Sequence, residues 1–147
     1  MRISAKGRYA LAATINMALS DIKDYITLIS ISDKLGISKI YLEQVFSLLK
    51  RGGIVLSIKG SQGGYQLTRT PNQITVNEVL SAVETSMFEP TEDTVKEKAA
   101  DIEAAMKDKI FASLDLTVKT YLQNITIYDL ATEAAKHNED QSYMFFI

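Results

Sequence analysis

The fold class of this chain is set by residues 28–69, which are predicted to form two short helices and then two short strands. The second helix, residues 38–52, has Ser38 as its cap, and Gly52 can end it in the left-handed conformation. Its apolar residues recur at helical spacing and place one stripe against a core: Leu42, Val45, Phe46 and Leu49. The polar residues left for its other surfaces are Lys39, Glu43, Gln44, Ser47, Lys50 and Arg51.

The neighbouring segments complete a recognisable arrangement. Residues 28–35 are predicted to form a shorter helix that begins after Thr27 and stops at Gly36. Two helices joined by a tight turn, with a polar face on the second, form a helix-turn-helix. Residues 54–59 and 65–69 are predicted to be strands joined by a glycine-rich turn. The expected fold is mainly α with a small β wing: a winged helix-turn-helix domain.

Two further helices are expected in this winged domain, which spans residues 1–84. Residues 4–20 are predicted to form the first, with Ser4 as its cap. Thr75 is predicted to cap the other, and Glu78 three positions later completes a capping box.

A loop at residues 85–94 is expected to lead into a long helix, residues 95–124. One apolar stripe continues along it for about seven turns: Val95, Ala99, Ile102, Met106, Ile110, Leu114, Val118 and Leu122. The chain offers no second helix of equal length, so a partner chain is the simplest cover, and a homodimer is predicted. The alternative is that the helix lies across its own winged domain. Residues 125–147 are expected to form a last helix, to about residue 137, and a tail.

Charge is unevenly divided along the chain. Residues 1–70 carry ten Lys/Arg and four Asp/Glu, whereas residues 71–147 carry six and fourteen, so that +6 and −8 give the overall −2. A basic half beside an acidic half fits a polyanion-binding module joined to a different one, although chance can also divide charge unevenly.

Several classes of protein are excluded or disfavoured. Cysteine is absent, which excludes disulfides and thiolate metal sites within the chain. No run is long and apolar enough to span a bilayer, so no membrane association is expected. The basic N-terminus could imitate a signal peptide, but Thr14 and Asn16 interrupt its apolar run, and a cytoplasmic location is expected.

A helix-turn-helix places the N-terminal part of its second helix in the DNA major groove. The candidates for contact there are Ser38, Lys39, Tyr41, Glu43 and Gln44. Glu43 can accept a hydrogen bond from a cytosine amino group, and Gln44 can bond an adenine edge. Glu43 could instead be a surface charge or pair with Lys39 or Lys50, and Tyr41 could contact either a phosphate or the core.

The hairpin turn is small and polar, which suits insertion beside or into a minor groove, although an ordinary tight hairpin would look the same. The turn residues expected at the DNA are Ser61, Gln62 and Gly63. The candidate phosphate contacts are Arg2, Lys6, Arg8, Lys50, Arg51, Lys59 and Arg69. Such contacts release counterions, so binding should weaken steeply with salt.

Four stretches resemble one protein family: residues 1–10, 41–44, 63–67 and 124–130. Through them the chain resembles the bacterial winged-helix regulators that include IscR and CymR, and most closely the cysteine metabolism repressor CymR. The resemblance implies a sequence-specific transcriptional regulator, a repressor of cysteine and sulfur metabolism genes. It also implies binding of double-stranded DNA at a pseudo-palindromic operator and supports base reading by Glu43.

The family also implies a cofactor that this chain cannot hold. IscR-like members bind an iron–sulfur cluster through three cysteines after the fourth helix, but residues 88–109 contain neither Cys nor His here. His137 is the single histidine, so no metal site and no cofactor are expected. No nucleophile stands beside a base in the sequence, and the glycine-rich turn lacks the Lys-Ser/Thr of a phosphate loop, so no enzyme is expected.

The last seven residues, 141–147, are unusually apolar for a chain end, so they are expected to be buried or to bind a partner. They could pack on their own dimer. The resemblance implies another role, because CymR ends in a very similar run. Cysteine synthase (O-acetylserine sulfhydrylase) recognises partners that end in isoleucine. That enzyme is therefore an expected partner, and an adaptor acting mainly through it is the alternative function. The partner-binding residues would be Tyr143, Phe145, Phe146 and Ile147.

Overall fold

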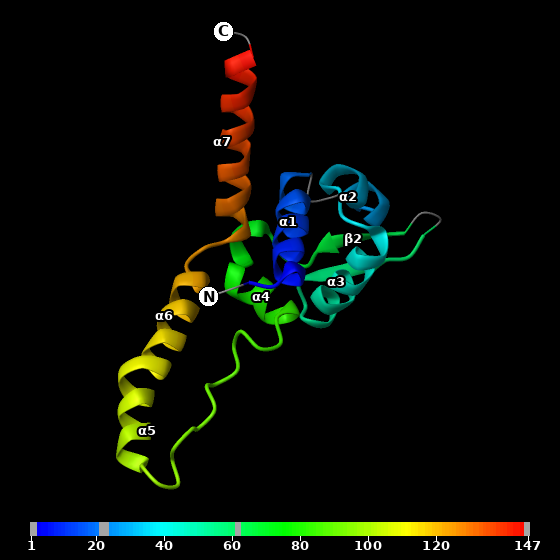
Figure 1. The fold of residues 1–147 in the computed structure, drawn as a ribbon. Coiled ribbons are helices and arrows are strands. Elements are labelled where there is room, and N and C mark those ends of the chain that lie inside the picture. The colour runs from blue at the N-terminus through cyan, green and yellow to red at the C-terminus, as the bar shows by residue number, and fades with distance from the viewer. Residues whose placement is uncertain (1–2, 21–23, 61–62, 146–147) are drawn as a thin grey trace.

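The structure is a computed structural model that describes residues 3–20, 24–60 and 63–145. It is mainly helical with a small two-stranded antiparallel sheet, which confirms the predicted fold class. Figure 1 shows a winged body from which two helical arms project in opposite directions, one formed by α5 and α6 and the other by α7.

The winged body is built on helices α1 (Ala5–Leu19), α2 (Leu28–Leu35), α3 (Lys39–Arg51) and α4 (Val76–Val83). Each begins at a predicted cap whose side-chain oxygen accepts a backbone N–H: Ser4, Thr27, Ser38 and Thr75. The carboxylate of Glu78 in turn accepts the backbone N–H of Thr75, so the predicted capping box is present. Local capping therefore sets where these helices start.

The ends of α2 and α3 differ from each other. Gly36 ends α2 in the left-handed conformation with φ 68°, as predicted. Gly52 has an ordinary φ of −77°, and the left-handed residue is Gly53 with φ 75°, so the predicted role of Gly52 is wrong. A Cβ on Gly52 would lie 2.6 Å from the Cβ of Ala82. Gly52 therefore permits the close approach of α3 to α4.

The wing consists of β1 (Val55–Ile58) and β2 (Gly64–Leu67), with Val55 opposite Leu67. Both strands are shorter than predicted. Ile26, upstream of α2, pairs with Tyr65 through two backbone hydrogen bonds of 3.0 and 2.9 Å. This isolated β-bridge, which the sequence did not predict, joins the hairpin to the segment before the helix-turn-helix.

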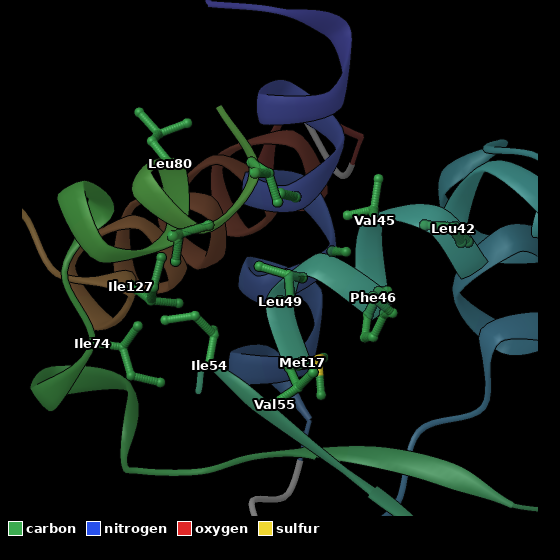
Figure 2. Packing of buried hydrophobic residues seen from close by; sticks show 14 of the residues in the cluster. Met17, Leu42, Val45, Phe46, Leu49, Ile54, Val55, Ile74, Leu80 and Ile127 are labelled. Carbon is green, nitrogen blue, oxygen red and sulfur yellow. The ribbon is translucent and has the colours of Figure 1, made fainter. Parts of the chain in front are cut away.

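The core lies between α1, α3, α4 and the base of the wing (Figure 2). All four predicted core residues of α3 are completely buried, and the Phe46 ring lies 4.8 Å from the ring of Tyr65. Burial of each such side chain contributes about 1.5–3 kcal/mol. The inner face of α3 is thus fixed, which leaves its outer face to a ligand.

The N-terminus of α1 is tied to the C-terminus of α4. The backbone N–H and the hydroxyl of Ser4 both donate to Oε1 of Glu84, at 2.9 and 2.8 Å. Gly7 lies against this carboxylate, where a Cβ would collide with it.

The long helix consists of α5 (Ala100–Met106), a π-helical turn (Lys107–Phe111) and α6 (Ala112–Gln123). It begins at Ala100, so the predicted start at Val95 is wrong. The buried carboxylate of Glu103 accepts the N–H groups of Thr94 and Val95, at 2.9 and 2.6 Å. These bonds hold residues 94 and 95 against the first turn of α5, so this segment does not continue the helix.

The π-helical turn decides which apolar residues share a face. Residues four apart on an α-helix rotate by about 40° around it, so a strict four-residue stripe drifts. The wider turn opposes this drift, and Ile102, Ile110 and Leu114 are all about half exposed. In α6 the drift resumes: Val118 packs on the core and Leu122 is only 9 % exposed. The last part of the predicted dimer stripe therefore belongs to the chain's own body.

The start of the last helix, α7 (Ile127–Phe145), is bonded to the segment that leads into α4. The N–H of Val76 donates to the carbonyl of Ile125, and the N–H of Ile127 donates to the carbonyl of Ile74, both at 2.9 Å. The helix extends to Phe145 rather than ending near residue 137, so most of the predicted tail is helical. Among the described residues no helix is long and apolar enough to cross a membrane.

Candidate nucleic-acid interface

The outer face of α3 presents polar side chains opposite its buried stripe. Glu43, Gln44 and Ser47 are exposed, whereas Leu42 and Phe46 are completely buried. The hydroxyl of Ser38 accepts the N–H of Tyr41 and fixes the first turn. The N-terminal part of α3 is thus an ordered, accessible helix end of the kind that enters a major groove.

Glu43 lies beside a lysine on this face. Nζ of Lys39 is 3.8 Å from its Oε1, and both side chains are more than half exposed. An exposed pair of this kind is worth at most about 1 kcal/mol, so a base could displace the lysine. The sequence left open an intrahelical partner for Glu43, and Lys39 rather than Lys50 occupies that position. Base reading by Glu43 stays a prediction.

Tyr41 lies on the side of α3 that is close to the core. Its ring packs edge-on against the ring of Tyr9, with centroids 5.0 Å apart, and the residue is partly buried against the core. Of the two roles that the sequence left open, this position favours the core contact.

The basic candidates are distributed over three elements. Arg8 on α1, Lys50 and Arg51 at the end of α3, and Lys59 after β1 are exposed, and Lys6 is half-buried. Gly63 is described and adopts a left-handed φ of 61° at the base of the turn. Arg2, Ser61 and Gln62 lie outside the described residues.

Arg69 differs from the other basic candidates because it is engaged with the body. Its Nη2 is 3.0 Å from Oε1 of Glu78, and its Nη1 donates to the carbonyl of Gln73 at 2.9 Å. In this arrangement Arg69 anchors the base of the wing to α4. Its prediction as a phosphate contact is weakened accordingly.

The pKa of Glu78 is changed by these neighbours. Partial burial alone would raise its pKa, but hydrogen bonds from Thr75 and from the Arg69 guanidinium outweigh burial and lower the pKa below its usual range.

The segment for which the resemblance implies cluster cysteines has carboxylates instead. Asp93 pairs with Lys96 at 3.0 Å, and Glu103 accepts two backbone N–H groups. Within the ranges that the structure describes, no three His, Cys, Asp or Glu residues are placed to hold a metal ion. Since the chain has no cysteine, its donors do not fit an iron–sulfur cluster bound through thiolates.

A cleft of about 670 Å³ lies between α4, the loop that follows it and α6. Asn77, Ser81 and Glu84 line it from α4, and Leu114 and Val118 line it from α6. Oδ1 of the buried Asn77 has no hydrogen-bond partner among the described residues.

Sequence reasoning missed two residues on exposed faces. Ile40, in the first turn of α3, is strongly exposed, and so is Tyr121 on α6. Ile40 was missed because the search considered polar contacts only. Tyr121 was missed because the predicted stripe takes residues mostly four apart, although Tyr121 lies seven positions after Leu114 and so on the same helical face.

An ordered helix-turn-helix with an accessible recognition helix, a β wing and basic side chains on both defines a winged-helix DNA-binding protein. Comparisons with known proteins agree. The sequence model of the Rrf2 family, described as an iron-dependent transcriptional regulator, matches residues 3–133. The chain belongs to the Rrf2 family.

Individual relatives point to the same class. The HTH-type transcriptional regulator IscR of Pectobacterium atrosepticum is 36 % identical over 130 residues, 88 % of this chain and 79 % of that protein. The solved structure of CymR (YrzC), the global cysteine regulator of B. subtilis, is similar with a TM-score of 0.72 and 33 % identity, covering 90 % of this chain and 98 % of that one. The structure of T. potens IscR has a TM-score of 0.71 at 28 % identity, covering 99 % and 96 %.

The chain is therefore a DNA-binding transcriptional regulator that resembles both IscR and CymR, as the sequence predicted. These relatives are regulators and not enzymes, which agrees with the expectation that this chain is not an enzyme.

Proposed function

We propose that this regulator acts in the cytoplasm as a homodimer that represses genes from a pseudo-palindromic operator. The observation that carries the proposal is the uncovered apolar face of the long helix. Ile102, Ile110 and Leu114 are about half exposed on an arm that projects from the body (Figure 1). A second copy is the simplest cover, and two-fold symmetry would present two recognition helices to two half-sites.

The exposure of residues on α6 supports a revised set of residues for the proposed dimer face. Leu114 is 54 % exposed and Tyr121 is 68 % exposed, and a separation of seven residues aligns them on one face. Leu122 is withdrawn into the body. The proposed seam is therefore Ile102, Met106, Ile110, Leu114 and Tyr121 rather than a stripe that ends at Leu122.

Charge substitutions on α6 test the seam. Leu114→Glu with Tyr121→Glu should yield monomers in analytical ultracentrifugation and lose operator binding. Leu116→Glu is the matched control, since Leu116 is 66 % exposed but lies about 200° around the helix from Leu114. A double variant that remains dimeric, or a control that dissociates instead, would place the dimer contact elsewhere.

We further propose that Glu43 and Gln44 read bases in the major groove. Both are exposed in the N-terminal half of α3, and a carboxylate among phosphates is favourable only where it reads a base or restrains a basic neighbour. Glu43→Ala should broaden the set of fragments selected from random DNA. Asp33→Ala, which removes the same charge from the exposed surface of α2, should leave that set unchanged. An unaltered motif in Glu43→Ala would exclude direct readout.

The genes under control are proposed to be those of cysteine and sulfur metabolism. The likeness to the B. subtilis cysteine regulator over nearly the whole length of both chains supports this assignment. Selection of bound fragments from the host genome tests it. Enrichment of promoters unrelated to sulfur would redirect the assignment while leaving DNA binding intact.

A second candidate function rests on the other arm. Helix α7 projects from the body, and Tyr143 and Met144 near its end are strongly exposed (Figure 1). We propose that this end binds cysteine synthase, with Ile147 as the anchor and Phe145 and Phe146 beside it. The side chain of Phe145 and residues 146–147 lie outside the described part of the structure, so the argument rests on the exposed apolar end and on the resemblance.

Calorimetry with the chain of residues 1–147 and a variant lacking Ile147 separates the possibilities. Only the chain that ends in Ile147 should bind the enzyme, and O-acetylserine should compete because the carboxylate of Ile147 would occupy its pocket. Equal binding by both proteins, or indifference to O-acetylserine, would remove this mechanism and leave packing on the dimer as the role of the tail.

A further inference from the structure

The first turn of α3 carries a large apolar side chain on the face opposite the core. Ile40 is 72 % exposed, which makes it the most exposed isoleucine, leucine or valine in the part of the chain that the structure describes. It precedes Glu43 by three positions and Gln44 by four, so the three side chains are neighbours on one helical face. Ile40 is thus placed among the candidate base-reading residues.

The fold does not need an isoleucine at this position. The core side of α3 is occupied by other residues, and its start is capped by Ser38. A β-branched residue in the first helical turn offers no advantage in helix propensity over alanine. Ile40 is therefore free to contact a ligand, and its place beside Glu43 and Gln44 makes DNA the ligand to consider.

The major groove contains one apolar group that could do so. Thymine carries a C5-methyl group on its major-groove edge, and the other bases present hydrogen-bond donors and acceptors there. We propose that Ile40 is a specificity-determining residue that contacts a thymine methyl group next to the base pairs read by Glu43 and Gln44. The inference rests on the proposed placement of α3 in the major groove.

The size of the effect follows from the burial of one methyl group. Such burial corresponds to about a fourfold change in affinity. Deoxyuridine pairs as thymidine does and lacks only this methyl group. Replacing the contacted thymine in one half-site should therefore weaken binding of the wild-type protein about fourfold.

The test is a double-mutant cycle between protein and DNA. An operator obtained by selection is prepared with each half-site thymine replaced in turn by deoxyuridine, and dissociation constants are measured at one salt concentration. In the wild-type protein one thymine should prove sensitive. In Ile40→Ala the same replacement should change affinity less than about 1.5-fold, because the methyl group has lost its partner.

Two further variants serve as controls. Ile40→Val keeps a branched side chain and should keep the sensitivity to deoxyuridine. Ile29→Ala removes an isoleucine that is 58 % exposed on the first helix of the helix-turn-helix, and it should keep the full fourfold effect. Circular dichroism should be unchanged in all three variants, since neither isoleucine is part of the core.

The outcomes separate this inference from the function on which it rests. If the wild-type protein binds an operator but no thymine is sensitive, or if Ile40→Ala retains the sensitivity, the role of Ile40 is wrong and DNA binding stands. If the wild-type protein selects no DNA sequence, the placement of α3 in the groove fails, and the role of Ile40 fails with it.

Discussion

Replacing Gly7 by alanine should destabilise the protein, although the same change in most helices is stabilising. Gly7 lies in the first turn of α1, where alanine normally gains about 0.5–1 kcal/mol over glycine. Here the added Cβ would collide with Oε1 of Glu84 and lie 2.8 Å from Cγ2 of Ile3. Because the Glu84 side chain is flexible, it would move and release its hydrogen bonds from Ser4.

The cost follows from the bonds that this movement breaks. The N–H and the hydroxyl of Ser4 donate to Glu84 at 2.9 and 2.8 Å, both at the exposed surface. Each bond contributes about 0.5–1.5 kcal/mol, so their loss costs about 2 kcal/mol. After the gain in helix propensity is subtracted, the net loss is about 1 kcal/mol, or a melting temperature lower by about 3 °C.

Urea unfolding at a fixed protein concentration measures this change. Gly60→Ala is the control, because a Cβ there meets no atom of the described residues within 4 Å, and its stability should stay within about 0.5 kcal/mol of the wild type. In a Glu84→Ala background Gly7→Ala should destabilise less, because no hydrogen bonds between Ser4 and Glu84 remain to be lost. A Gly7→Ala variant more stable than the wild type, or an unchanged loss without Glu84, would refute the reasoning.

Three further outcomes are expected. Lys59→Ala should weaken binding to all DNA sequences alike and reduce the salt slope by about one, whereas Lys98→Ala in the acidic half should do neither. The purified protein should be colourless and free of iron and acid-labile sulfide, and a stoichiometric chromophore would contradict this. Phe46→Ala should cost about 3–5 kcal/mol in urea unfolding, because Phe46 is completely buried, and a loss below 1 kcal/mol would contradict the described core.

The winged body could be predicted from sequence because its signals are local. Ser38, Thr75 and Gly36 act within four residues of where they stand, through caps and a left-handed stop. The burial of the α3 stripe follows from helical spacing alone. Local hydrogen bonds and helical periodicity therefore account for the helix-turn-helix and for which face of α3 is free.

The arms could not be predicted to the same precision because distant contacts determine them. The apolar periodicity begins at Val95, before the true start of the long helix at Ala100. Glu103 accepts the backbone N–H of Val95, eight residues earlier, and this contact keeps Val95 out of the helix. The stripe also assumes a constant helical turn. The π-helical segment and the packing of Leu122 on the body change which residues remain exposed, so that Tyr121 is exposed and Leu122 is buried.

In the candidate site, too, the residue types could be predicted from sequence but their contacts could not. Sequence could name basic residues but not their partners, and Arg69 is held by Glu78 on a helix that follows it in the chain. A search for polar contacts also passed over Ile40, although the helical spacing that buries Leu42 and Phe46 places Ile40 on the free face of α3.

The Arg69–Glu78 contact at the base of the wing also predicts a pH dependence of stability. Hydrogen bonds from Thr75 and Arg69 lower the pKa of Glu78 in the folded state, against the effect of burial. A carboxylate with a lowered pKa stabilises the fold fully above its unfolded value of about 4.3, and this contribution disappears as pH falls through the folded pKa.

Glu78→Gln isolates this contribution, because glutamine can still complete the capping box but cannot pair with Arg69 as an ion. The wild type should be the more stable protein between pH 5 and pH 7, by a constant margin. That margin should shrink progressively below about pH 4.3 in a series of urea unfolding curves, since Glu78 then becomes protonated and neutral like the glutamine. A margin that is independent of pH, or that grows in acid, would mean that the carboxylate charge does not hold the wing to α4.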